Sequence, residues 1–138
     1  MNLEFSQGFM DEHKAKILDL FLTYQMIETM LFMKLYLPGI SETEDRGDYL
    51  EDINKKLNSK TLGKLRKEYL RKYPSDNYNL ALDLEVLGTQ RNSFMHSLCM
   101  TIGLCDSREK AFMLGELIVN SSYEHANSVR DKVVNLNF

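Results

Sequence analysis

The segment ILDLFLTYQMIETMLFMKL, residues 17–35, decides the fold class. Its large apolar residues recur at steps of three and four, which is the period of an amphipathic helix. The residues that set this period are Ile17, Leu20, Phe21, Tyr24, Leu31 and Leu35. We predict a helix over about residues 11–37, ended by Pro38, because proline clashes within a helix and lacks a backbone donor.

The same periodicity predicts three more helices, over about residues 62–73, 79–102 and 106–134. Ser59 or Thr61 is expected to cap the first of these, and Asp106 or Ser107 the last. Strands are not predicted, because no alternating run of β-branched residues is bounded by turn signals. Residues 1–138 are therefore predicted to form one all-α domain, an up-and-down bundle of four to five helices.

The composition is that of an ordinary globular protein, with 43% hydrophobic and 27% charged residues. The net charge of −3 argues against a surface given over wholly to nucleic acid, although it is compatible with a local basic patch. No stretch has the roughly 18 consecutive apolar residues of a membrane span, and the polar N-terminus does not resemble a signal peptide. Cys99 and Cys105 match neither a zinc spacing nor a redox spacing. We expect a cytoplasmic protein with two reduced thiols and no membrane association.

One charge interrupts the apolar stripe of the helix predicted over residues 79–102. Arg91 occupies the helical step between Leu87 and Phe94, near the centre of that stripe. A guanidinium keeps its proton, so it must be ion-paired, extend to solvent or face a polar cleft.

Glu28 is a second charge in an apolar stripe, which it shares with Tyr24, Leu31 and Leu35. A carboxylate there is costly unless it is hydrogen-bonded or ion-paired. We predict that Glu28 lies near Arg91 and helps to orient it. The alternative is a carboxylate at the boundary of the core.

Asn92 and His96 are four residues apart and share one face of an ideal helix, whereas Arg91 and His96 diverge by about 140°. A two-fold axis that brings two copies of the chain together would compensate for this divergence. A single histidine on a helix is more often structural than catalytic. Arg91, Asn92 and His96 therefore indicate a functional site only in combination.

The heptapeptide QRNSFMH, residues 90–96, late in a long helix of a small helical bundle, resembles the HEPN domain family (higher eukaryotes and prokaryotes nucleotide-binding). The hallmark of that family is an Arg, a gap of four to six residues and then a His, often with a polar residue directly after the Arg. Here the gap is four residues and the polar residue is Asn92. The resemblance extends over most of the chain as a helix pattern, and its specific part is Arg91, Asn92 and His96.

This resemblance implies a metal-independent endoribonuclease that acts as a homodimer, without a cofactor, and that has Arg91, Asn92 and His96 as its catalytic residues. It also implies a toxin of a toxin–antitoxin or phage-defence system, with RNA as the substrate and a protein antitoxin as a partner. Family members paired with nucleotidyltransferases carry a Tyr two residues after the His, and here that residue is Leu98, so regulation through that tyrosine is not expected. The alternative is a non-catalytic HEPN-like module that binds a nucleotide or a protein partner.

The chemistry of RNA cleavage suits these side chains. An imidazole titrates near neutral pH and can accept or donate a proton, and a guanidinium can oppose the negative charge that develops on phosphorus-bound oxygens. No metal site is predicted, because His13, His96 and His125 stand on different helices without a metal-ligand spacing.

A basic segment, residues 55–72, contains eight Lys and Arg residues and a single acid. It can hold a phosphate backbone, or it can be a solvated helix face that balances the acidic segment before it. Tyr69 can stack on bases or belong to the core face of the same helix. The candidates for RNA contacts are Lys60, Lys64, Lys67 and Arg71.

The first helix has more apolar surface than one core face requires, because Met26, Met30 and Met33 lie outside its main stripe. Exposed apolar area of this extent is rare in monomers. We therefore predict a homodimer whose interface includes this surface and the helix over residues 79–102.

Overall fold

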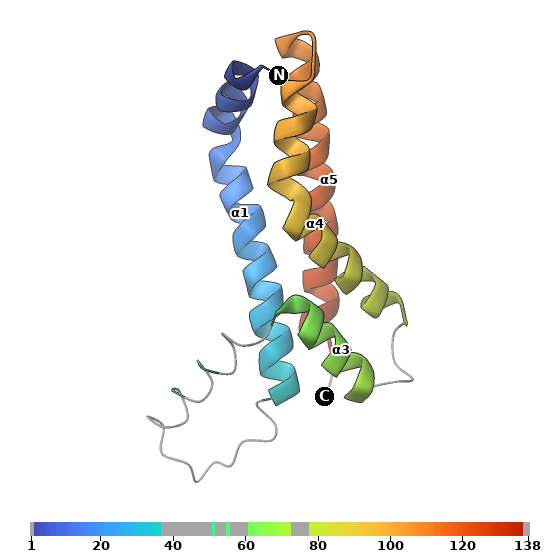
Figure 1. The fold of residues 1–138 in the computed structure, drawn as a ribbon. Helices are drawn as coiled ribbons and strands as arrows, with labels where there is room; N and C mark the ends of the chain where they lie inside the picture. The colour runs from blue at the N-terminus through green and yellow to red at the C-terminus, as the bar shows by residue number, and fades with distance from the viewer. Residues whose placement is uncertain (1, 37–50, 52–54, 56–60, 73–77, 137–138) are drawn as a thin grey trace.

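The computed structural model describes residues 2–36, 51, 55, 61–72 and 78–136. Within these ranges the chain forms four α-helices and no strand (Figure 1). The helices are α1 (Leu3–Tyr36), α3 (Leu62–Lys72), α4 (Tyr78–Gly103) and α5 (Arg108–Val134). The predicted all-helical class is confirmed.

The three long helices α1, α4 and α5 lie side by side, and the short α3 crosses the lower part of the bundle (Figure 1). The chain descends in α1, ascends in α4 and descends again in α5. Helices α1 and α5 are therefore parallel to each other and antiparallel to α4. Helix α3 packs on both α4 and α1. None of the described helices combines the length and apolar character that crossing a membrane requires.

The core lies along the axis between the long helices, where their apolar stripes meet. Tyr24, Phe32 and Leu20 of α1 are among its largest fully buried side chains. Helix α4 contributes the apolar stripe that Arg91 interrupts. Helix α3 adds three side chains that close the lower end of the core. These buried residues are Leu80, Leu84, Leu87, Phe94, Leu98 and Ile102 of α4, and Leu62, Leu65 and Tyr69 of α3.

Helices α1 and α5 approach each other closely at Gly115. A Cβ placed on Gly115 would lie 2.6 Å from Cε2 of Phe9, so no larger residue fits there without displacing the fully buried Phe9 ring. Farther down the same interface, the hydroxyl of Tyr123 donates a hydrogen bond of 2.9 Å to Oδ2 of Asp19. This interface therefore combines close apolar packing at Gly115 with polar contacts such as the one between Tyr123 and Asp19.

Helix α1 begins at Leu3, eight residues before the predicted start at residue 11. The Asn2 side chain caps it, because its Oδ1 accepts hydrogen bonds from the amides of Glu4 and Phe5. The backbone amide of Asn2 also donates to the carbonyl of Gly103 over 2.8 Å, which ties the start of α1 to the end of α4. The apolar period of this helix is strongest from Ile17 onward and carries no information about the Asn2 cap.

The other helix ends agree with the predictions where the structure describes them. Ser107 caps α5, since its side chain accepts from the amide of Lys110. Thr61 caps α3, since its Oγ1 accepts from the amide of Lys64. The alternative cap, Ser59, lies outside the described residues.

Two lysines bind backbone carbonyls at the lower end of the bundle. Nζ of Lys34 on α1 donates to the carbonyl of Val134 over 2.8 Å and to that of Leu136. Nζ of Lys72 on α3 donates to the carbonyl of Leu35 over 3.3 Å. The C-terminal ends of both α1 and α5 are therefore contacted by a lysine from another helix.

Candidate active site

Arg91 of α4 and Glu28 of α1 form an ion pair, between Nη1 and Oε1. Their side chains are 31% and 20% exposed, so the pair is mostly withdrawn from solvent. The contact that we predicted between these two charges is confirmed. The contact joins one nitrogen of the guanidinium to the carboxylate, and a guanidinium carries five N–H groups in all.

A pocket of about 400 Å³ lies where α3 crosses α4, and Arg91 and Asn92 line it. The opposite wall comes from the start of α3, around Gly63 and Arg66. Two glycines help to keep the pocket open, since Gly63 and Gly88 present no side chain to it. We call this cavity the α3–α4 pocket; its lining residues are Thr61, Leu62, Gly63, Arg66, Leu84, Glu85, Gly88, Thr89, Arg91 and Asn92.

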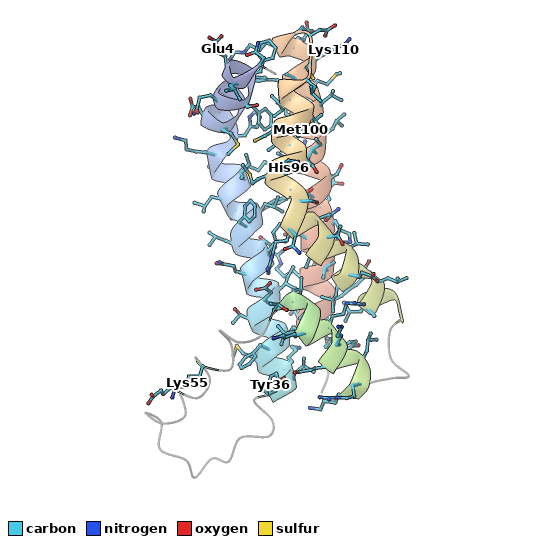
Figure 2. All side chains as sticks on the ribbon, viewed as in Figure 1. Glu4, Tyr36, Lys55, His96, Met100 and Lys110 are labelled. Carbon is cyan, nitrogen blue, oxygen red and sulfur yellow. The ribbon has the colours of Figure 1, made fainter. Side chains whose placement is uncertain are left out.

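His96 lies on the same helix, one turn before Met100, in the part of α4 above the pocket (Figure 2). Its side chain is exposed, and no described residue forms a hydrogen bond or an ion pair with it. His96 is not among the residues that line the α3–α4 pocket. Within one chain the structure thus brings Arg91 and Asn92 to one cavity and leaves His96 on the helix surface beyond it.

The basic face predicted for RNA is exposed on α3. Lys64, Lys67 and Arg71 are exposed and spaced at three and four residues, so they share one side of the helix. Lys60 lies outside the described residues. Tyr69 is fully buried in the core, so it is unavailable for stacking on a base.

Two residues of the pocket were not singled out by the sequence: Arg66 and Glu85. They form an ion pair at the pocket wall, with Nη1 of Arg66 3.6 Å from Oε2 of Glu85. Arg66 was one of eight basic residues in its segment, and Glu85 lay on a polar helix face, so neither interrupted an apolar pattern. Without such an interruption, nothing in the sequence indicates that these two residues form a pair.

An apolar stripe runs along the outside of α1. Leu18, Leu22, Met26 and Met33 are between 44% and 60% exposed and recur at helical spacing on one face. Met30, which we had grouped with them, is partly buried against the core. We call these four exposed residues the α1 stripe.

Metal ligands do not gather anywhere in the part of the chain that the structure describes: no three His, Cys, Asp or Glu side chains come together there. Comparisons of the chain with protein-family models, with curated proteins and with solved structures find no match.

Proposed function

We propose that this protein is a metal-independent endoribonuclease of the HEPN type, with Arg91, Asn92 and His96 as its catalytic residues. The observation that carries the proposal is the setting of Arg91. A charged residue in the middle of an apolar stripe is held by Glu28 at the wall of an open polar pocket, beside Asn92, instead of being packed away. A guanidinium that is ion-paired to a carboxylate and still 31% exposed at a pocket wall is suited to binding a phosphate.

The proposed reaction is attack of the ribose 2′-hydroxyl on the adjacent phosphorus. The bond to the 5′-oxygen breaks, and the products are a 2′,3′-cyclic phosphate and a 5′-hydroxyl end. His96 moves the proton, either from the 2′-hydroxyl or to the leaving 5′-oxygen. Arg91 stabilises the charge on the nonbridging oxygens, and Asn92 positions the ribose or the phosphate.

A homodimer completes this site in the proposal. Arg91 and His96 point in directions about 140° apart on one helix, so a single chain does not present both to one phosphate. A second copy, related by a two-fold axis, supplies whichever of Arg91 and His96 the first copy does not present to the phosphate. The exposed α1 stripe, together with α4, offers an apolar surface for that contact.

Cleavage of a labelled RNA in excess EDTA tests the proposal. The wild type should cut it and leave 2′,3′-cyclic phosphate ends. His96→Ala should lose at least the ~10²–10⁴-fold that is typical of removing a general acid or base, and Arg91→Ala should lose a similar factor. Asn92→Ala should lose less. Ser97→Ala is the matched control, because Ser97 is an exposed neighbour on the same helix, and it should cut like the wild type.

Two results would overturn the enzymatic proposal. One is a wild-type protein that leaves every tested RNA intact, and the other is cleavage that persists unchanged in the His96 variant. The first would favour the alternative function, a non-catalytic HEPN-like module. The α3–α4 pocket is the observation that supports this alternative, because it can hold a nucleotide without cleavage.

Oligomeric state is tested separately by light scattering at tens of micromolar protein. The wild type should be a dimer. Met26→Glu places a charge in the α1 stripe and should give a monomer without nuclease activity. Met113→Glu places the same charge on an exposed position of α5 and should leave the dimer intact. A monomeric wild type would contradict this part of the proposal.

A further inference from the structure

The α3–α4 pocket has the size of a nucleotide building block. Its volume of about 400 Å³ falls within the roughly 300–1,000 Å³ range of small-ligand sites. Glycines at residues 63 and 88 leave space between the two helices: a Cβ added at Gly63 would meet no atom nearer than 3.9 Å, and one at Gly88 none nearer than 3.7 Å. The pocket is therefore a hollow that side chains do not fill.

The Arg66–Glu85 pair places a hydrogen-bond acceptor next to a set of donors at the pocket wall. The two groups touch through one N–O contact of 3.6 Å, and the Glu85 side chain remains 58% exposed. A carboxylate has about four acceptor positions and a guanidinium has five donors. Glu85 consequently keeps acceptor positions for a ligand, and Arg66, which is 24% exposed, lies beside it with further donors.

Among the four RNA bases, guanine matches this arrangement best. Its Watson–Crick edge presents two adjacent donors, N1–H and the N2 amino group, beside the acceptor O6. A carboxylate can accept from both donors, while a neighbouring guanidinium donates to O6, a contact that arginine commonly makes with guanine. Adenine and cytosine each place a ring-nitrogen acceptor where the carboxylate would lie, and uracil offers one donor only.

The pocket lies beside the residues that are proposed to act on the cleaved bond. Arg91 and Asn92 line the same cavity as Arg66 and Glu85. A nucleotide whose base contacts Arg66 and Glu85 therefore has its ribose and phosphate close to the residues proposed to act on the phosphate.

We propose that the α3–α4 pocket is a nucleobase subsite that selects guanine next to the scissile phosphate, with Glu85 and Arg66 as its specificity-determining residues. The part that concerns the scissile phosphate rests on the proposed ribonuclease function. The binding of a guanine nucleotide in the pocket does not.

Titration of the protein with guanosine 3′-monophosphate, followed by amide chemical shifts, tests the subsite without any cleavage. The amide signals of Gly63 and Gly88 should shift, and the 3′-monophosphates of cytidine, uridine and adenosine should bind about tenfold more weakly, as expected for one good bidentate base contact. Glu85→Gln should remove most of this difference. Glu124→Gln is the control, because Glu124 is an exposed carboxylate on α5, away from the pocket.

Cleavage of RNA oligonucleotides that differ in a single base then separates the two proposals. We expect cutting next to guanine in the wild type, and cutting without base preference in Glu85→Gln. RNA cleavage with no guanine preference, together with no shift at Gly63 and Gly88, would overturn the subsite and leave the ribonuclease proposal standing. Guanine nucleotide binding without RNA cleavage would overturn the ribonuclease and keep the subsite.

Discussion

Helix α1 meets its two long neighbours in different ways. Against α5 it is fitted closely, with the Phe9 ring resting on Gly115, where not even a methyl group has room. Against α4 it places a carboxylate opposite a guanidinium, through Glu28 and Arg91, beside an open pocket. The first contact maximises packing, and the second withdraws two charges from water.

In our proposal the first contact serves stability and the second serves function. Apolar packing of similar volume is often as stable as a buried ion pair, or more stable, because desolvation offsets the attraction between the charges. A chain under no other constraint would gain nothing by keeping the pair. In the proposed function the pair serves the guanidinium's role in the pocket, and the predictions below test that role against the packing of α5.

The largest expected effect follows from replacing the ion pair by apolar residues. Glu28→Leu combined with Arg91→Met should leave the free energy of unfolding unchanged or raise it by about 1 kcal/mol, while RNA cleavage falls at least ~100-fold. Chemical denaturation and the cleavage assay measure the two quantities. Asp19→Leu combined with Tyr123→Phe removes a polar pair between α1 and α5 and should preserve cleavage. A strong loss of stability in the first double variant would assign the pair a structural role.

The next largest effect concerns the close contact with α5. Gly115→Ala should lower the free energy of unfolding by roughly 1–3 kcal/mol, because overpacking against Phe9 outweighs the better helix propensity of alanine. Gly8→Ala is its counterpart across the same interface, where the added Cβ would lie an ordinary 3.5 Å from Cζ of Phe112. That variant should be neutral or more stable by up to about 1 kcal/mol. Equal effects of the two changes on thermal unfolding would contradict the close contact between Gly115 and Phe9.

A double-mutant cycle measures the ion pair itself. Glu28→Gln and Arg91→Gln, made singly and together, should give a coupling free energy of about 1 kcal/mol. This is below the cost of breaking a fully buried pair, because both side chains are partly exposed and solvent screens them. Additive effects would mean that the two charges do not interact in solution.

The smallest effect arises from Tyr24, which packs on the α5 side of α1. Burial raises the pKa of its hydroxyl above the ordinary value of 10.0, and the Ser122 side chain opposes this with a smaller effect. The folded state therefore holds the Tyr24 proton more tightly than the unfolded state does. The stability that this difference contributes is fully present below pH 10 and is lost as the pH rises toward the folded pKa. Between pH 9 and pH 11, the free energy of unfolding should fall less in the Tyr24→Phe variant than in the wild type. An identical pH dependence in denaturation curves would contradict the raised pKa.

Much of the fold was predictable from periodicity. The stripe through Leu84, Leu87 and Leu98 predicted which face of α4 is buried, and Ser107 predicted where α5 begins. The start of α1 was not predicted, because the Asn2 cap lies far from the strongest apolar repeat. The crossing of α3 over α4 was also beyond the sequence, since nothing in a helical period says where a short helix packs.

The candidate site was predictable only where a charge violated the apolar pattern. Arg91 and Glu28 stood out because each occupies a step that the stripe assigns to an apolar residue, and two such charges are most economically paired. Arg66 and Glu85 violate no pattern, so the wall of the pocket became visible only in three dimensions. The catalytic roles of Arg91, Asn92 and His96 remain predictions from the HEPN resemblance.

The parallel course of α1 and α5 has an electrostatic consequence. Both helices end at the lower end of the bundle, where each macrodipole places about half a negative charge. Lys34 of α1 and Lys72 of α3 donate to the carbonyls there, so their positive charges partly neutralise these helix ends. Such contacts weaken as salt rises. The anchoring of these two helix ends should therefore be salt-sensitive, whereas the backbone hydrogen bond from Asn2 to Gly103 at the upper end is neutral.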